Sequence, residues 1–216
     1  LIGYADLLLR RAQRDGQLPE RDQRAVRIIS DQAGRLNRLI AALLDLSRIE
    51  TGQLSIERGE VALSALVDRL VRETQATLQT HHQLAWDLPD EPLTVSGDEL
   101  RVEQVVQNLI QNAIKYSPAG GTITVRLARD GEWARLLVSD EGIGIPEQAL
   151  PNLFKRFYRA PNTDEHHISG MGVGLFVVRE IVQLHGGDIH VESTEGKGTT
   201  VTLLLPLMSS TELGQA

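Results

Sequence analysis

The feature that most constrains the fold is a long amphipathic repeat between residues 20 and 50. Apolar side chains return there in steps of three and four, which is the heptad spacing of helices that pack along their length. The apolar positions of this repeat are Val26, Ile28, Ile29, Ala33, Leu36, Leu39, Ile40, Leu43, Leu44 and Leu46. Because so broad an apolar surface exceeds the two columns of a two-stranded coiled coil, it favours a four-helix bundle.

A second helix is predicted before this repeat. Residues 1–14 carry apolar side chains on one side of a helical pattern, and residues 15–19, Asp-Gly-Gln-Leu-Pro, have turn chemistry. One such hairpin supplies only two of the four helices of a bundle. We therefore expect residues 1–51 to form a helical hairpin that makes a homodimer through residues 1–50. The alternative is packing of the long helix against the chain's own second domain.

Shorter elements follow the hairpin. Helices and antiparallel strands mixed in this way predict an α+β sandwich over residues 52–207, with one sheet covered on one face by helices. Ser96 and Glu99 stand at capping-box spacing and indicate a helix start. The predicted strands are 54–57, 84–88, 122–129, 132–140, 188–193 and 198–206, the predicted helices are 63–79, 96–116, 147–154 and 173–185, and the remaining segments are an irregular polar stretch at 155–170 and a flexible tail at 208–216.

Composition narrows the partners and the compartment. The chain has 22 basic and 29 acidic side chains, and its net charge of −7 argues against nucleic acid or an anionic membrane as partner. It has no cysteine, which excludes disulfides and thiolate metal sites. No apolar run approaches the ~20 residues that a membrane-spanning helix needs, and no signal peptide opens the chain. Because the sequence begins inside a helical pattern, we expect a cytoplasmic fragment whose membrane attachment, if any, lies upstream.

The first chemical motif is the helix segment 108–116. Asn108, Asn112 and Lys115 stand at i, i+4 and i+7, so one helix face presents two carboxamides and an ammonium group. An amide oxygen can ligate Mg²⁺ while water and phosphate oxygens complete the octahedron, and a lysine can meet phosphate charge. Taken by itself, this segment is better explained as a solvated polar face.

The second motif runs from Asp140 to Pro146 and directly follows an apolar strand. A carboxylate at a strand end can accept a hydrogen bond from an exocyclic amine such as that of adenine. Gly142 and Gly144 would let the backbone approach a flat ring closely. An ordinary strand–turn–helix connection is the alternative interpretation.

The third motif is residues 170–175, Gly-Met-Gly-Val-Gly-Leu, which open a helix. Backbone amides at a glycine-rich helix start form an anion site suited to a polyphosphate. A Rossmann-type dinucleotide site is excluded, because no strand immediately precedes the motif and no βαβ unit surrounds it.

The fourth motif, residues 196–200, is a turn that brings hydroxyl groups to the start of the last strand. A plain hairpin is the alternative interpretation of this motif.

Together the four motifs resemble, in order and spacing, the N, G1, G2 and final Gly-Thr elements of the GHKL (Bergerat) ATP-binding fold. Histidine kinases, type II topoisomerases, Hsp90 and mismatch-repair ATPases share that fold. Residues 153–159 resemble the F box of histidine kinases, and residues 3–8 and 43–52 resemble the two helices of their dimerisation and phosphotransfer domain, HisKA. The chain is thus similar over residues 1–207 to the sensor histidine kinases of two-component systems, with an HATPase_c catalytic domain after a truncated HisKA domain.

This resemblance implies that ATP and Mg²⁺ are the ligands. Asn112 would ligate the Mg²⁺ with Asn108 in support, and Asp140 would accept a hydrogen bond from the adenine amine. Residues 155–170 would form a lid that closes over ATP. On the phosphate side the resemblance implies Lys115, Arg156, Arg159, Gly170, Gly172 and Gly174, and along the rest of the nucleotide pocket Tyr116, Gly142, Gly144, Val173, Leu175 and Thr199.

The amide of Asn108 also bears on the mechanism. The topoisomerase and chaperone branches resemble each other in having a Glu at this place that activates water, whereas an amide cannot act as a general base. We therefore expect the γ-phosphoryl to be retained for a protein nucleophile, with Mg²⁺, Lys115 and backbone amides positioning it. Intrinsic ATP hydrolysis is predicted to be slow.

The phospho-acceptor is expected outside this chain. In the family it is a histidine of the first helix, and alignment on Gly3 and Tyr4 would place it about nine residues before Leu1. None of the six histidines occupies an equivalent position, so we expect no autophosphorylation of this chain. The full protein would pass the phosphoryl group to an aspartate of a response-regulator receiver domain. A non-catalytic, nucleotide-binding pseudokinase is the alternative, and a serine kinase of the anti-sigma type, which lacks the hairpin, ranks last.

Overall fold

The computed structural model describes residues 20–166, 168 and 170–208, and the chain divides after residue 53 into two units. The first unit contains α2 (Glu20–Glu50), one continuous helix over the predicted span. Six of its large apolar side chains are exposed, namely Ile28, Ile29, Leu36, Ile40, Leu43 and Leu44. The predicted helix over residues 1–14 lies outside the described residues.

The second unit is built on a five-stranded sheet. Its strand order is β2-β4-β5-β7-β6; β2 and β4 are parallel, and the other neighbours are antiparallel. Strands β1 and β3 form a separate antiparallel pair. The elements of this unit are β1 (Gly59–Ala62), α3 (Leu63–Thr77), β2 (His82–Asp87), β3 (Thr94–Gly97), α4 (Glu99–Lys115), β4 (Gly121–Asp130), β5 (Trp133–Asp140), η1 (Glu147–Asn152), α5 (Asn162–Glu165), α6 (Gly174–Leu184), β6 (Asp188–Thr194) and β7 (Gly198–Pro206).

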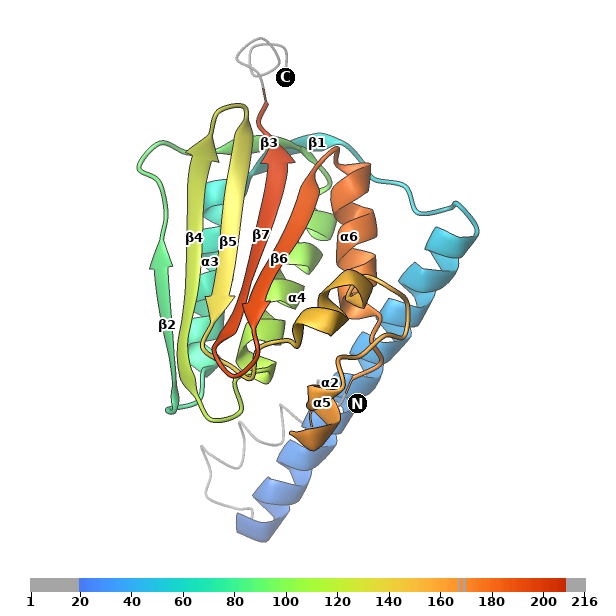
Figure 1. Cartoon of the computed structure of the whole chain (residues 1–216), viewed down its shortest axis with the longest axis vertical. Coiled ribbons are helices and arrows are strands. Elements are labelled where there is room, and N and C mark those ends of the chain that lie inside the picture. The colour runs from blue at the N-terminus through green and yellow to red at the C-terminus, as the bar shows by residue number, and fades with distance from the viewer. Residues whose placement is uncertain (1–19, 167, 169, 209–216) are drawn as a thin grey trace. The chain divides into compact units, whose positions relative to one another are not determined.

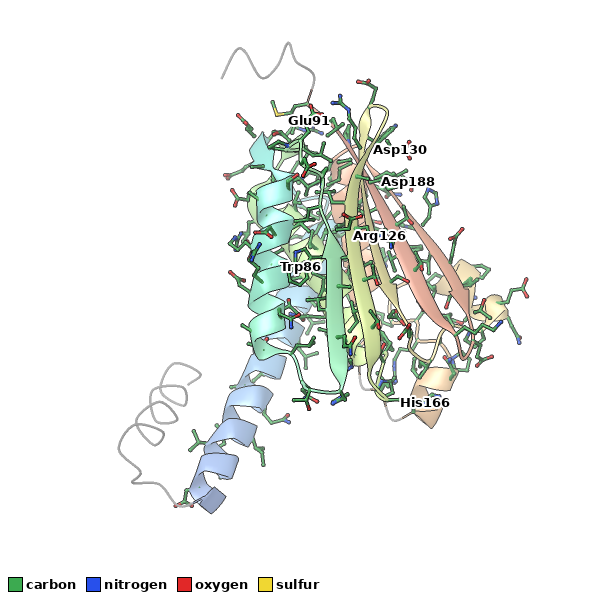
Figure 2. All side chains as sticks on the ribbon, turned by 90° about the vertical axis from the view of Figure 1, so that its left-hand side faces the viewer. Trp86, Glu91, Arg126, Asp130, His166 and Asp188 are labelled. Carbon is green, nitrogen blue, oxygen red and sulfur yellow. The ribbon has the colours of Figure 1, made fainter. Side chains whose placement is uncertain are left out.

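Helices α3, α4 and α6 lie together behind this sheet in Figure 1, and the turned view in Figure 2 shows α3 on one side of the strands. Alternate residues of β4, such as Ile123 and Val125, are fully buried because side chains of a strand point alternately to its two faces. One face of α4, which includes Val106 and Ile110, is buried as well. The predicted α+β sandwich is therefore confirmed.

The predicted strand at 54–57 is wrong, as is the predicted capping role of Ser96. The strand lies instead at Gly59–Ala62, where it pairs with β3, and Ser96 is opposite Glu60 in that pair. The N-cap of α4 is Asp98, whose side chain accepts a hydrogen bond from Arg101 N at 3.1 Å. Pairing of two short segments far apart in the sequence decided both points, and local spacing carries no signal for it.

Three smaller differences concern short segments. The predicted helix at 147–154 is a 3₁₀ helix of six residues, η1, with Pro151 inside it. The stretch predicted as irregular contains a short helix, α5. Met208, placed in the predicted tail, donates from its backbone N to Thr94 O at 2.9 Å, and residues 209–216 lie outside the described part.

The described residues were also searched for membrane segments. None of the helices found within residues 20–166, 168 and 170–208 combines the length and the apolar character needed to cross a bilayer. Every described helix of the second unit that packs on the sheet has one buried apolar face and one polar face. The polar face of α4 is the one that carries the predicted chemistry.

Candidate functional site

The two asparagines of the first motif lie side by side on α4. Asn112 Nδ2 donates to Asn108 Oδ1 at 2.8 Å, and both side chains are half-buried. The start of α6 packs against them, because a methyl group placed on Gly174 would lie 3.1 Å from Asn108 Nδ2. The first and third motifs are therefore in direct contact.

The last turn of α4 makes the next contact between motifs. Lys115 Nζ lies 3.3 Å from the hydroxyl of Tyr116 and 4.7 Å from the centre of its ring. A methyl group on Gly170 would come within 2.8 Å of the same ammonium group. Ile143 N donates to Tyr116 O at 2.9 Å, which joins the first motif to the second.

Asp140 joins the second motif to the fourth. It ends β5, and its Oδ1 accepts hydrogen bonds from Gly142 N at 2.9 Å and from Thr199 N at 3.3 Å. Burial raises the pKa of the Asp140 carboxyl, and these two backbone N–H groups oppose the rise by stabilising the carboxylate. The charged form of this carboxyl group is therefore stabilised by two backbone N–H donors in a half-buried place.

The glycines of the second motif are required by close packing. A methyl group on Gly142 would collide with Tyr116 O, and one on Gly144 would collide with Thr194 O. Gly144 also has a φ of 60°, a left-handed conformation that side chains rarely adopt. Backbone from three separate segments therefore meets closely around Asp140.

The predicted lid begins with an unusual backbone conformation. Phe157 has a φ of 61° although it is not glycine, and its side chain is 61% exposed. Gly172, with a φ of 68°, lies beneath this segment, where a methyl group would collide with Tyr158 O. The Arg156 guanidinium lies over the Phe176 ring at 5.4 Å, so it is held near the start of α6.

Arg159, in contrast, is turned into the lid. Its Nη2 donates to Ile168 O at 2.6 Å and to Thr163 Oγ1 at 3.2 Å, and it forms an ion pair with Asp164 at 2.9 Å. In this structure its donors are directed to lid atoms, while those of Arg156 lie near α6. Among the other predicted residues, Val173 is fully buried at the N-cap of α6 and Leu175 is half-buried in its first turn.

Two further residues support the site and were missed in the sequence. Asn162 is buried, and its Nδ2 donates to Gly144 O at 3.0 Å, which ties the lid to the second motif. Ser193 Oγ donates to Gly198 O at 2.8 Å and accepts from Ile145 N at 2.9 Å. An asparagine in a polar stretch and a serine in a strand are too common to signal such contacts.

Figure 2 places His166 at one end of the second unit, with Glu91 and Asp130 at the other, so the lid lies at one end of the sheet.

A hollow of about 400 Å³ lies beside the last turn of α4. Lys115 is the only predicted nucleotide residue in its wall, which is formed by Thr74, Thr77, Leu78, Gln79, His81, His82, Ile114, Lys115 and Pro118. This hollow is therefore distinct from the region around Asp140.

Comparison with known proteins agrees with this arrangement. Residues 97–209 match the family described as histidine kinase-, DNA gyrase B-, and HSP90-like ATPase, and residues 1–52 match the His Kinase A (phospho-acceptor) domain. The sensor histidine kinase WalK of Bacillus subtilis (strain 168) is 35% identical over 88% of this chain and 31% of its own length. This chain thus spans less than a third of that relative.

Two solved structures share the fold. The Acinetobacter baumannii histidine kinase AdeS matches with a TM-score of 0.67 and 25% identity, over 95% of this chain and 96% of that one. Full-length ShkA in complex with AMPPNP matches with a TM-score of 0.70 and 25% identity, over 90% of this chain and 40% of that one. The resemblance predicted from the sequence is confirmed by these matches.

Proposed function

The chain belongs to the histidine kinase-, DNA gyrase B-, and HSP90-like ATPase family and also matches the phospho-acceptor domain of histidine kinases, and from this premise we propose a catalytic core that phosphorylates a histidine. Residues 52–207 bind ATP with Mg²⁺ and transfer the γ-phosphoryl group to a histidine imidazole. A receiver-domain aspartate of a response regulator then takes the phosphoryl group. Residues 1–51 supply the dimerisation and phosphotransfer hairpin.

The observation that carries this proposal is the set of contacts among the four motifs. Asn108 contacts Gly174, Ile143 N bonds to Tyr116 O, and Asp140 accepts from Thr199 N. Segments that are far apart along the chain are thus gathered around two amides, one carboxyl group and one glycine-rich helix start. That combination suits a nucleotide triphosphate better than any one of the motifs does alone.

The residues at this site fit a magnesium ion that is shared with the nucleotide. The bond from Asn112 Nδ2 to Asn108 Oδ1 orients both amides, and a hard amide oxygen is a ligand that Mg²⁺ accepts. Asn112 would hold the ion with Asn108 in support, while phosphate oxygens and water complete the coordination. When bound, the ion neutralises charge on the phosphate oxygens during transfer.

The protein's own part in the transfer is to hold the triphosphate and to exclude hydrolysis. The amides at the start of α6, from Gly170 to Gly174, donate to phosphate oxygens, and the Lys115 ammonium lies next to Gly170. Arg156 adds positive charge from the lid. Because Asn108 cannot remove a proton from water, the γ-phosphoryl group stays intact until an imidazole nitrogen attacks it.

Recognition of the base depends on Asp140. Its carboxylate accepts a hydrogen bond from the exocyclic amine of adenine, and Thr199 helps to hold the ring. The raised pKa of Asp140 makes this recognition sensitive to acid, because a protonated carboxyl group loses acceptor capacity. ShkA, which resembles this chain, has been crystallised with AMPPNP, and this supports a similar ligand here.

Calorimetry with AMPPNP tests the nucleotide site. We expect binding that Mg²⁺ strengthens, and a loss of roughly tenfold or more in affinity for Asp140→Asn, since a half-buried acceptor becomes a mismatched amide. Asp188→Asn changes an exposed carboxylate of β6 and is the matched control, with unchanged affinity expected. Absence of magnesium-dependent binding by the unaltered chain would overturn the proposed function.

Phosphotransfer separates the kinase from the pseudokinase alternative. The chain is incubated with γ-labelled ATP and a protein that carries a phospho-acceptor histidine motif. Acid-labile, base-stable label on that histidine supports the kinase, and nucleotide binding without label supports a pseudokinase scaffold. We further propose that ATP hydrolysis without an acceptor is slow and that the reaction takes place in the cytoplasm.

A further inference from the structure

A group of contacts lies at the N-terminal end of α4 and the C-terminal end of α6, away from the residues proposed to bind the nucleotide. These contacts play no part in the proposed chemistry. Residues 51–58, called the linker below, connect α2 to β1 and are attached there at two points. Glu57 N donates to Asp98 Oδ2 at 3.2 Å, and Arg58 Nη2 donates to Leu184 O at 3.0 Å. Since Asp98 precedes α4 and Leu184 ends α6, the linker bonds to both helices that carry nucleotide residues.

His185 joins these two helix ends directly. Its side chain is 1% exposed, its Nε2 accepts a hydrogen bond from Asp98 N at 3.0 Å, and its Nδ1 is 2.7 Å from Ile181 O. Because a backbone N–H can only donate, Nε2 carries no proton, and the Nδ1 proton is given to Ile181 O. A methyl group on Gly97 would collide with the imidazole, so the ring occupies a closely fitted place.

The helix pair is therefore held at two separate places. At one end His185, the C-cap of α6, bonds to Asp98, the N-cap of α4, and at the other end Gly174 of α6 packs on Asn108 of α4. Ten residues of α4 separate the two contacts, which is about 15 Å at 1.5 Å per residue. A contact that stops two packed helices from sliding at one end also sets their register at the other.

We propose that His185 is a positioning residue of the nucleotide site, which sets the register of α6 on α4 and so places Asn108 and Asn112 opposite the phosphate-binding start of α6. Glu57 and Arg58 connect the linker to the same contacts. The five residues Glu57, Arg58, Asp98, Leu184 and His185 are called the clasp below. This inference rests on the proposed function, because the positioned residues are those of the proposed ATP site.

The clasp has a consequence for regulation. A pull on the linker would remove the bonds from Glu57 to Asp98 and from Arg58 to Leu184 O, and thereby loosen both helix ends at once. Coupling of two sites is reciprocal, so nucleotide bound at the proposed site, beside Asn108, Asn112 and the start of α6, would in turn strengthen the clasp. Helix α2, which precedes the linker in the chain, would thus gain a route to the phosphate site.

Two substitutions of His185 separate register from simple packing. His185→Gln keeps an oxygen that can reach the place of Nε2 and accept from Asp98 N, but it loses the bond to Ile181 O. His185→Asn keeps a donor at the place of Nδ1 for Ile181 O, but it is too short to reach Asp98. Both variants are polar and smaller than histidine, so a packing defect would affect them alike.

Amide hydrogen exchange of the nucleotide-free chain is the first measurement. We expect His185→Asn to exchange at least tenfold faster than the unaltered chain at Asp98 and also at the far contact, in Asn108 and Val177, with His185→Gln close to the unaltered chain. Faster exchange confined to residues near 98 and 185, or equal changes in both variants, would overturn the register proposal. This measurement needs no nucleotide, so it is independent of whether ATP binds.

The linker is tested with an exposed residue, so that folding is not at risk. Arg58→Ala removes the bond to Leu184 O, and Arg135→Ala, an exposed arginine of β5 paired with Asp130, is the matched control. We expect only Arg58→Ala to speed exchange at Asn108 and to weaken magnesium-dependent AMPPNP binding, by about threefold to tenfold. If Arg58→Ala and Arg135→Ala behave alike in the exchange experiment, the linker has no part in the register. The expected exchange results, together with no AMPPNP binding by the unaltered chain, would instead leave the register proposal standing and refute the proposed function alone.

Discussion

Helices α2 and α4 are both long and amphipathic, yet they treat their apolar faces in opposite ways. In α2 the side chains of Leu36, Ile40 and Leu43 are 57%, 48% and 47% exposed. In α4 the side chains of Val106 and Ile110 are 0% and 1% exposed. The apolar face of α4 is thus buried within the second unit, whereas that of α2 is exposed in the described part of the chain.

The difference shows what each helix is stabilised by. A helix gains most of its stability from burial of its apolar face, and α4 obtains this burial from the sheet and from α6. Exposed apolar rows of this extent are unfavourable on a monomer and mark an interaction surface. The comparison therefore supports the proposed dimer through α2, and each prediction below tests one side of it.

The largest effect is expected in the core around α4. Replacement of Ile110 by alanine leaves a cavity behind the sheet and should lower the free energy of unfolding of the second unit by about 2–5 kcal/mol. Leu100→Ala, in the same helix but at a 71% exposed position, should change it by less than about 0.5 kcal/mol. Thermal and denaturant unfolding measure both. Equal effects of the two substitutions would break the contrast between buried and exposed faces.

The second effect concerns association through α2. Ile40→Ala together with Leu43→Ala should raise the dimer dissociation constant roughly 100-fold, at more than about 1 kcal/mol for each residue, while the unfolding of the second unit stays unchanged. Analytical ultracentrifugation measures the association. Gln32→Ala changes an exposed polar residue of the same helix and should leave it unaltered. A chain that is monomeric before substitution would disprove the dimer directly.

The third effect lies on the polar face of α4. Asn112→Ala should weaken AMPPNP binding about tenfold in the presence of Mg²⁺, which corresponds to about 1.4 kcal/mol, and much less in its absence. Gln107→Ala removes another polar side chain of α4, one that bonds to Glu103, and serves as the control. Calorimetry of the unaltered chain and of both variants, with and without Mg²⁺, gives the six affinities. The same loss under both conditions would assign Asn112 a role other than that of a metal ligand.

The smallest effect is a dependence of stability on pH at the clasp. Burial, with a smaller contribution from the nearby Arg58 charge, lowers the pKa of His185 below its ordinary value, although Ile181 O and Asp98 oppose this. The unfolded chain therefore binds a proton at about pH 6.5, where the folded chain does not. Stability should fall as pH drops below about 6.5 and level off below the folded pKa, by about 1.4 kcal/mol for each unit of difference.

Unfolding at several pH values checks this last prediction. His185→Gln should lose less stability between neutral and mildly acid pH than the unaltered chain, since glutamine does not titrate. His190→Gln changes an exposed histidine that pairs with Asp188 and should follow the unaltered chain. A variant lacking His185 that keeps the full pH dependence would show that other groups cause it.

The sequence predicted those parts of the site that depend on neighbours along the chain. The spacing of Asn108 and Asn112 predicted one helix face, and the turn chemistry after Asp140 predicted a strand end. The contacts of Asn162 with Gly144 and of Ser193 with Gly198 could not be predicted, because each joins residues whose local surroundings are ordinary. The role of Asp98 as the helix cap was missed because Ser96, at an equally favourable spacing, is taken up by a strand pair.

By itself, therefore, the sequence determined the long helix α2, the α+β pattern after it, and the four motifs with their family resemblance, since all of these are written in local periodicity and order along the chain. Only the tertiary structure decided that β1 pairs with β3, that Arg159 turns into the lid, and that His185 bonds to Asp98 at the clasp. Each of these depends on which distant backbone groups need a hydrogen-bond partner once the core has packed, and a single sequence carries no periodic signal for that.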